Sequence, residues 1–491
     1  MKKRLLFFSL LLSVAFSYGQ KVQWGDFYTC EDHNKTRFDY MGNIDGKDYY
    51  SFGYYVTGGY LGRFNRIGFF SFTDTNNFNE RKDFITFPKN SLITTCVTSN
   101  EPAFIYEDKN KDNSQNRDII ISYVDKNSFT QQKTKTLLTF DKKNTHSYYS
   151  SKNKNYHLFV VYQWDKKKKN IENMSLNVFD KDFNLLWSKD LKNQTVADMW
   201  IRDILITDNG EVYTLCSYYE NVSDKKDKSE SLWITYSSKE DNYRRIIEYN
   251  EEIDEAGLCP LKDDMVLVGL ITDNEFKTLT FSLRESKVIS TSSFTLKMSN
   301  SEKKKAKDQA VWNISDFLTL DNGNVVCIVK DMFSVWVEPA KSPGYLEKFD
   351  RNFYVLCVNP KQKDLVYSQL ISRSTKYVVQ YRIQRTDYEK PIFYTYNNNV
   401  YAIYNTDGKD DEFSGKIHTT PYVEYFNKPK EIVSRILKIT PDGKAESENI
   451  ITYKDAKAMI STTMTHEKEK GKIILGSRGK KDVSMGIINI N

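Results

Sequence analysis

The side chains that most often carry catalysis are few in this sequence and stand far apart. It has five histidines, at His33, His146, His157, His418 and His466. No two of them have the spacing of a metal-binding pair, and His466-Glu467 does not continue into an HExxH motif. The GxSxG, P-loop and GxGxxG motifs are also missing. A glycosidase-type pair of distant carboxylates stays open because acidic residues are abundant, but the sequence leans away from an enzyme.

One short stretch has the oxygen spacing of a calcium-binding loop. Asp108, Asn110 and Asp112 alternate with lysines. The sixth position of such a loop is normally glycine, whereas here it is Asn113, and no glutamate stands at the twelfth position. A polar hairpin tip is therefore the favoured interpretation. Calcium at these three residues is the weaker alternative, and no other cofactor is expected.

Two segments between expected strands are unusually aromatic and are the best candidates for a partner-binding surface. The first, residues 331–352, carries Trp336, Tyr345 and Phe349, and the second, residues 405–429, carries Phe413, Tyr422, Tyr425 and Phe426. Aromatic rings dominate the energetics of interfaces, so exposed loops that keep them either pack on each other or bind a partner. Packing of the two loops on each other, protein binding and a sugar-stacking platform all remain open.

Two arginines are candidates for a central channel. Arg382 and Arg385 lie in a stretch where Tyr381 and Ile383 alternate with polar residues. If this stretch faced the axis of a closed β structure, the two guanidinium groups would grip an anion there. Salt bridges on the surface or within one sheet are the simpler explanation.

These candidates must be positioned by β-strands, because helical periodicity is nearly absent and apolar–polar alternation runs through the chain. A hairpin unit recurs: residues 176–179 with 185–191, 278–283 with 288–296, 353–358 with 365–371, and 435–439 with 445–452. If each unit has four strands, the third strands lie near Ile67, Ile120, Leu176, Trp233, Leu279, Tyr354, Ile436 and Ile487. Their spacing averages about 60 residues, somewhat above the usual length of a propeller blade.

Short turns close the hairpins, and the last unit is incomplete. Residues 203–216 match residues 316–327, with an Asp-Asn-Gly turn at the same place in both, which favours a tight hairpin because Asn and Gly tolerate positive φ. The last unit has only three expected strands before residue 491. A strand within residues 22–28 would complete it and protect the sheet edge.

On these repeats the chain resembles the β-propeller superfold, of the kind found in exported Bacteroidetes-type proteins. The resemblance implies an all-β, single propeller of about seven or eight four-stranded blades over residues 20–491, closed by an N-terminal strand that joins the last blade. No subfamily motif accompanies it: Trp164-Asp165 lacks the upstream Gly-His of WD40 repeats, and kelch and Asp-box patterns are absent. A β-sandwich array is the structural alternative.

Residues 1–19 are expected to be a secretory signal peptide. Lys2, Lys3 and Arg4 precede an apolar run of about 12 residues, too short to span a bilayer. Ser17 and Gly19 are the small residues expected before the cleavage site. No cysteine follows the cut directly, so a lipid anchor is not expected, and the periplasm is favoured over the extracellular space.

Net charge bears on the class of partner, and the neighbours of the cysteines bear on whether disulfides form. Three of the six net positive charges belong to the signal peptide, so the remainder is close to balanced and argues against nucleic-acid binding. Four cysteines, Cys96, Cys216, Cys327 and Cys357, lie in apolar strands and are expected to be free and buried. The disulfide status of Cys30 and Cys259 stays open.

The sequence therefore favours a non-catalytic exported propeller that acts as a protein-binding scaffold. Its expected partner is another envelope protein, such as an outer-membrane secretion or uptake complex that the propeller would cap or regulate. A glycan-binding protein or glycan-active hydrolase is the alternative. No membrane span is expected, and the oligomeric state is undecided.

Overall fold

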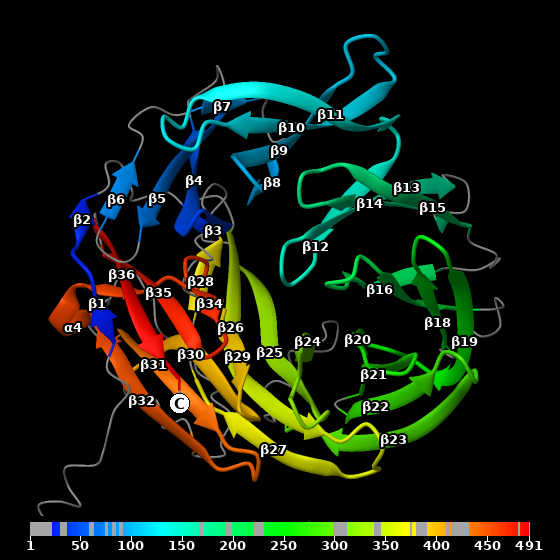
Figure 1. The fold of residues 1–491 in the computed structure, drawn as a ribbon. Helices are drawn as coiled ribbons and strands as arrows, with labels where there is room; N and C mark the ends of the chain where they lie inside the picture. The colour runs from blue at the N-terminus through cyan, green and yellow to red at the C-terminus, as the bar shows by residue number, and fades with distance from the viewer. Residues whose placement is uncertain are drawn as a thin grey trace, which may run out of the picture.

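A computed structural model of the chain describes residues 22–29, 37–57, 63–73, 77–80, 85–87, 92–165, 170–192, 199–219, 230–273, 275–297, 312–337, 345–373, 376–379, 390–408, 413, 432–479 and 482–490. In this part of the chain, eight antiparallel sheets succeed one another around a ring (Figure 1). The protein is an eight-bladed β-propeller, and the expected range of seven or eight blades resolves to eight. Within the described residues, no helix has the length and apolarity needed to cross a bilayer.

The first four blades follow the chain from its N-terminal half. Blade 1 contains β3 (Arg37–Ile44), β4 (Lys47–Thr57), β5 (Arg63–Thr73), β6 (Asn77–Glu80) and β7 (Ile85–Phe87). Blade 2 contains β8 (Leu92–Val97), β9 (Pro102–Lys109), β10 (Asn116–Val124) and β11 (Gln131–Asp141). Blade 3 contains β12 (Thr145–Ser150), β13 (Tyr156–Asp165), β14 (Asn170–Asp180) and β15 (Leu185–Lys192). Blade 4 contains β16 (Met199–Ile206), β17 (Val212–Tyr218), β18 (Glu230–Ser237) and β19 (Asn242–Glu251).

The other four blades complete the ring. Blade 5 contains β20 (Glu255–Pro260), β21 (Met265–Thr272), β22 (Glu275–Ser282) and β23 (Lys287–Thr295). Blade 6 contains β24 (Trp312–Thr319), β25 (Val325–Val337), β26 (Tyr345–Val358), β27 (Leu365–Ile371) and β28 (Lys376–Val379). Blade 7 contains β29 (Ile392–Tyr396), β30 (Asn399–Asp407), β31 (Ile432–Ile439) and β32 (Ala445–Thr452). A short helix, α4 (Tyr453–Ala456), leads to β33 (Ala458–Ile460), β34 (His466–Glu469), β35 (Lys472–Gly479) and β36 (Asp482–Asn489) of blade 8.

The first strand of each blade lies toward the axis and the fourth lies at the rim (Figure 1). Every one of the eight expected third strands is confirmed: the residues proposed for them fall in β5, β10, β14, β18, β22, β26, β31 and β36. Because the strands alternate in direction, the turns after first and third strands share one end of the ring, called here the turn face. The connections after second and fourth strands share the opposite end, called here the loop face.

The hydrophobic core is divided among the blade interfaces. Eight clusters of buried residues each join two neighbouring blades, including one between blades 8 and 1. Along β26, Phe353, Val355 and Cys357 pack toward blade 7, whereas Tyr354 and Leu356 pack toward blade 5. Successive side chains of a strand point to opposite faces, so a strand buried on both faces must be apolar throughout.

This packing accounts for the cysteines. Cys96, Cys216, Cys327 and Cys357 are buried and free, which confirms the expectation from their apolar neighbours. Cys259, left open by the sequence, is also free and buried, while Cys30 lies outside the described residues. Burial raises the pKa of the Cys96 thiol to about 12, so this side chain stays protonated and acts as a small apolar group.

The Asp-Asn-Gly turns differ in detail from the expected tight hairpin. In the blade 4 turn, Gly210 N donates to Thr207 O at 3.0 Å and Thr207 N donates to Glu211 O at 2.8 Å. Of the turn residues, only Gly210 has positive φ, at 79°. The turn therefore ends in a one-residue bulge at glycine, and the asparagine before it keeps ordinary backbone angles.

The N-terminal segment completes blade 8. In this segment, β1 (Gln23–Trp24) and β2 (Tyr28–Thr29) both pair with β36, so the chain's two ends meet in one sheet (Figure 1). Trp24 lies opposite Gly486, where an added Cβ would come within 2.7 Å of the indole ring. Tyr28 stacks on Phe78 of blade 1 with 4.9 Å between ring centroids. The segment thus covers the free edge of β36 and joins blade 8 to blade 1.

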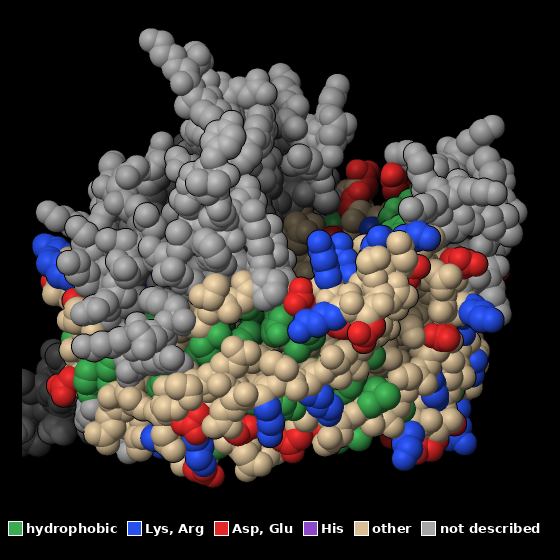
Figure 2. Space-filling view, turned by 90° about the horizontal axis from the view of Figure 1, so that it is seen from above, with side chains coloured by type: hydrophobic (Ala, Val, Ile, Leu, Met, Phe, Trp, Pro, Cys, Tyr) green, Lys and Arg blue, Asp and Glu red, His purple; other side chains and the backbone are tan. Residues whose placement is uncertain are grey.

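The outer surface mixes charges of both signs. Figure 2 shows lysine, arginine, aspartate and glutamate side chains interspersed among polar groups, with apolar side chains in patches between them. This agrees with the nearly balanced composition of the chain.

Replacing Trp24 with alanine should weaken ring closure. The indole is mostly buried against Gly486 and the core between blades 7 and 8. We therefore expect Trp24→Ala to lower the free energy of unfolding by about 2 kcal/mol. Urea denaturation followed by circular dichroism measures the change. Phe27→Ala is the matched control, since Phe27 lies in the same segment but is half exposed. Equal effects of the two substitutions would show that Trp24 does not hold the ring closed.

Candidate functional site

The first aromatic segment of the sequence is a hairpin rather than an irregular connection. β25 and β26 continue beyond the blade as a paired ladder, in which Trp336 pairs with Leu346 and Phe333 with Phe349. Tyr345 opens β26, and β28 pairs with the extended part of this strand. The backbone of Trp336, Tyr345 and Phe349 is thereby held on a projecting sheet at the loop face.

The remaining predicted site residues are only partly described. Phe413, in the connection between β30 and β31, is 44% exposed on the loop-face side of blade 7. Tyr422, Tyr425 and Phe426 and the channel candidates Arg382 and Arg385 lie outside the described residues. Their roles therefore stay predictions.

The suspected calcium loop is a turn organised by its own asparagine. Asn110 Oδ1 accepts hydrogen bonds from the backbone N–H groups of Asp112 at 3.0 Å and Asn113 at 2.7 Å. Asn110 Nδ2 donates to both carboxylate oxygens of Asp118, at 2.8 and 3.0 Å. This Asx turn explains the spacing of the polar residues without an ion. Calcium binding at Asp108, Asn110 and Asp112 stays an untested prediction.

Two exposed tryptophans stand at the loop face of neighbouring blades. Trp164 lies near the end of β13 in blade 3 and is 43% exposed, and its Nε1 donates to Thr145 Oγ1 at 3.0 Å. Trp200 lies at the start of β16 in blade 4, is 38% exposed, and meets Tyr219 edge to face at 5.3 Å. Large aromatic side chains that are held in place yet exposed are typical anchors of binding surfaces.

A buried ion pair between Arg202 and Glu230 lies beneath Trp200. Arg202 NH2 binds Glu230 Oε2 at 3.0 Å and Ile253 O at 2.8 Å, and Arg202 Nε donates to Ser217 Oγ at 2.7 Å. The Glu230 side chain is almost fully buried. The guanidinium group also lies 6.0 Å from the Trp200 ring. Both residues belong to blade 4, and their hydrogen bonds to the backbone of Ile253 attach the connection to blade 5 beneath Trp200.

A second polar chain lies under the loop face of blades 6, 7 and 8. Arg373 NH1 donates to Asn405 O at 3.3 Å, and Asn405 Nδ2 donates to Ile460 O at 2.8 Å. Ser434 Oγ donates to Asn405 Oδ1 at 2.6 Å and accepts from Ile460 N at 3.0 Å. All these side chains are fully buried. Buried polar groups that satisfy one another specify a unique arrangement, here of one blade against the next.

The described histidines are engaged in packing. His157 stacks on Phe183 with 4.2 Å between ring centroids and hydrogen-bonds Tyr148 Oη at 2.8 Å. His466 stacks on Tyr40 at 3.5 Å. Burial, and then the charge of Lys154, lower the pKa of His157 to about 3, so its ring is neutral at physiological pH.

Near the axis, a lysine links non-adjacent blades. Lys154, in the first turn of blade 3, donates to the backbone oxygen of Tyr40 in blade 1 at 3.1 Å. Its Nζ lies 4.7 Å from the centre of the Tyr40 ring, and burial lowers the pKa of its ammonium group. This contact ties the first turn of blade 3 to the first strand of blade 1.

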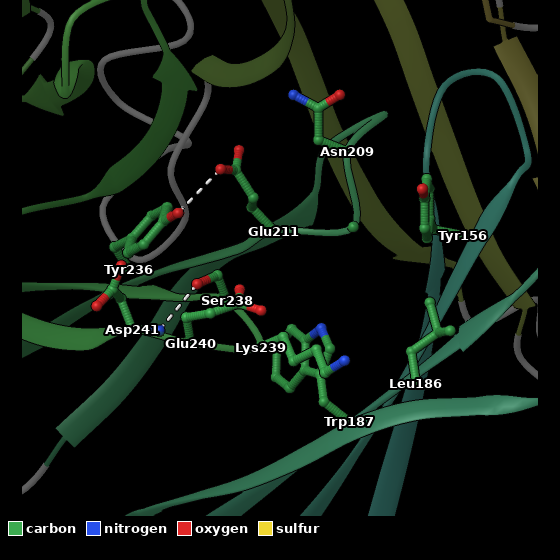
Figure 3. A pocket seen from close by; sticks show the side chains of 11 residues that line it. Tyr156, Leu186, Trp187, Asn209, Glu211, Tyr236, Ser238, Lys239, Glu240 and Asp241 are labelled. Atoms are coloured by element: carbon green, nitrogen blue, oxygen red, sulfur yellow. Dashed lines mark hydrogen bonds between the residues drawn. The ribbon is translucent and has the colours of Figure 1, made fainter.

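The turn face also carries a pocket of about 430 Å³ between blades 3 and 4 (Figure 3). Tyr156 and Leu186 stand on one side of it, Tyr236 and Glu211 on the other, and Trp187 between them. Neither this pocket nor the two exposed tryptophans were predicted from the sequence. The tryptophans have a detectable signal, because each stands at the end of an expected strand, but the pocket's residues come from four separate segments and form no motif.

Comparison with known protein families finds no match, and comparison with curated proteins finds none either. Among solved structures, the chain is similar to the propeller of Dos1, with 10% identity, 96% of this chain and 95% of that chain covered, and a TM-score of 0.43. It is also similar to a puromycin-hydrolyzing peptidase of Mycobacterium tuberculosis, with 8% identity and a TM-score of 0.38; the match covers 94% of this chain and 61% of that chain. The WD40 domain of SCAP from fission yeast shares 8% identity, with coverage of 96% and 98% and a TM-score of 0.35. A shared fold does not carry over an activity.

Removing the Glu230 carboxylate should destabilise the fold where blade 4 meets the connection to blade 5. Glu230→Ala leaves the Arg202 guanidinium without its carboxylate in a largely buried site, so we expect the free energy of unfolding to fall by about 3 kcal/mol. Urea denaturation measures this loss. Glu251→Ala is the control, because Glu251 pairs with Lys277 at the surface and should cost less than about 1 kcal/mol. A Glu230→Ala protein as stable as the control would contradict this role.

The neutral state of His157 predicts a loss of stability in acid. Its pKa is about 3 when folded and about 6.5 when unfolded, so below pH 6.5 the unfolded chain takes up a proton that the folded chain does not. The free energy of unfolding should therefore fall by about 2 kcal/mol between pH 7 and pH 5 from this residue alone. His157→Gln should remove this component, which urea titrations of both proteins at the two pH values would detect. Identical pH dependence in the two proteins would disprove the assignment.

Proposed function

We propose that this protein is an exported, non-catalytic propeller that binds another protein of the cell envelope through its loop face. The observation that carries the proposal is the pair of exposed, positioned tryptophans, Trp164 and Trp200, at the same end of adjacent blades. The half-exposed Phe413 of blade 7 adds a third aromatic side chain to this face.

The rigidity beneath this face supports binding rather than loose packing. The ion pair of Arg202 and Glu230 and the Asn405 network hold the blades in fixed relation at the loop face. An anchor that is already ordered loses little conformational entropy when a partner binds. The hairpin of β25 and β26 extends this surface outward and brings the backbone of Trp336 to the same side of the ring.

The compartment follows from the expected signal peptide of residues 1–19. On this proposal the protein resides in the periplasm, where its partner would be an envelope protein. An outer-membrane secretion or uptake complex, capped or regulated by the propeller, is the partner that this location favours. The nearly balanced charge agrees with a protein partner and not with a nucleic acid.

Affinity capture tests this function. The tagged chain of residues 20–491 is used to capture partners from detergent-solubilised envelopes, and mass spectrometry identifies them. A stoichiometric envelope protein is expected, and Trp164→Ala and Trp200→Ala should each weaken its binding by about 30-fold, the usual cost of removing a tryptophan anchor. Binding affinities of the purified pair measure this change.

Trp187→Ala is the matched control, because Trp187 lies on the turn face and its loss should leave the partner's affinity unchanged. Capture of no partner by a folded sample would contradict the proposal. A partner retained at full affinity by the protein lacking both Trp164 and Trp200 would contradict the assignment to the loop face.

A further inference from the structure

The turn-face pocket between blades 3 and 4 has a rigid floor. Tyr156 lies against Gly210, and a Cβ at that glycine would come within 2.9 Å of the tyrosine ring. The adjacent turns are tied together by Asn153 N, which donates to Asp208 Oδ1 at 2.8 Å. The two blades are thus locked to each other where the pocket forms, and its volume of about 430 Å³ is in the range of small-ligand sites.

Aromatic side chains form much of the pocket's wall. Tyr156, Trp187 and Tyr236 all line it, and each is only partly buried. Tyr236 is held from behind by Tyr243, stacked at 4.7 Å, and by Tyr213, edge to face at 5.3 Å. Because these neighbours fix its ring, the Tyr236 wall exists before any ligand arrives.

The charged groups of the pocket are mostly carboxylates. Glu211, Glu240 and Asp241 line it, against the ammonium group of Lys239. A second ammonium group, from Lys189, lies beside the lining, where it donates to Asp241 O at 2.7 Å and is 5.9 Å from the centre of the Trp187 ring. Glu211 Oε1 accepts from Tyr236 Oη at 2.9 Å (Figure 3), and Glu211 Oε2 accepts from Thr207 Oγ1 at 3.4 Å. Both donors are neutral hydroxyl groups. The half-buried carboxylate is therefore oriented by hydrogen bonds while its negative charge is left uncompensated within the described residues.

From this combination we propose that the pocket binds an organic cation, namely the guanidinium or ammonium group of an arginine or lysine side chain. Aromatic faces attract such cations, and an oriented carboxylate forms charge-assisted hydrogen bonds with them. The excess of carboxylates disfavours phosphates and acidic sugars. The source is either a free amino acid or an exposed basic side chain of a peptide, and both present the same group.

This site is independent of the partner surface proposed above. It lies at the opposite end of the ring: Trp187 is near the start of β15, and Glu211 is in the turn between β16 and β17, both at the turn face. Substitutions in the pocket therefore separate the two activities.

Titration calorimetry with paired probes tests the proposal. The folded chain of residues 20–491 is titrated with N-acetyl-arginine amide and with N-acetyl-citrulline amide, which has the same shape without the charge. The arginine probe should bind at least about tenfold more tightly, and Glu211→Gln should remove this preference while leaving an acceptor for Tyr236 Oη. Lys239→Ala should strengthen binding, because it removes a competing positive charge from the lining.

The controls distinguish the pocket from nonspecific attraction. Trp164→Ala, on the loop face, should bind the arginine probe as the unchanged protein does, whereas Trp187→Ala should bind it at least about tenfold less tightly. Comparison of the amide with a Gly-Arg-Gly peptide identifies the source, since a peptide-binding site prefers the longer probe. Absence of binding, equal affinity for arginine and citrulline, or full binding by Glu211→Gln would each overturn the proposal.

Discussion

The structure depends on sheets that are apolar on both faces and must therefore be covered on both. In blade 3, Leu158 and Val160 of β13 pack toward blade 4 while Phe159 and Val161 between them pack toward blade 2. Such a sheet cannot end a stack, because its outer face would remain exposed to water. Closure into a ring removes the ends, and the pairing of β1 and β2 with β36 secures the ring where the chain's own ends meet.

Apolar clusters fill the space between neighbouring blades. The relative position of the blades is fixed by polar contacts at their ends. At the loop face, Arg202 and Glu230 of blade 4 bind Ile253 in the connection to blade 5, and Asn405 joins blades 6, 7 and 8. At the turn face, Asp208 binds the Asn153 backbone and Asp182 binds the Ser99 backbone at 2.8 Å. Apolar packing alone tolerates sliding, whereas directional hydrogen bonds between neighbouring blades hold each in one position.

The two faces of the propeller differ in the side chains and recesses that they present. The loop face carries the exposed Trp164 and Trp200, which we propose as anchors for a protein partner. At the turn face, the described pocket forms between two blades, where Tyr156 of blade 3 meets Gly210 of blade 4. A wide aromatic surface and a small charged pocket thus arise from the same repeat.

The local apolar–polar pattern of the chain was sufficient to predict the repeated strands. The alternation around Leu176 or Tyr354 depends only on the two-residue period of a strand, so all eight third strands and the buried state of Cys327 were predictable. The continuation of β25 and β26 as a paired hairpin was not, because a polar and aromatic stretch reads equally well as a loop. The pocket of Trp187, Glu211 and Tyr236 was beyond prediction, since those residues meet only after two blades have packed. Local sequence determined which segments become strands, whereas the closure of the ring decided which turns became neighbours, because that depends on contacts between residues distant in the chain.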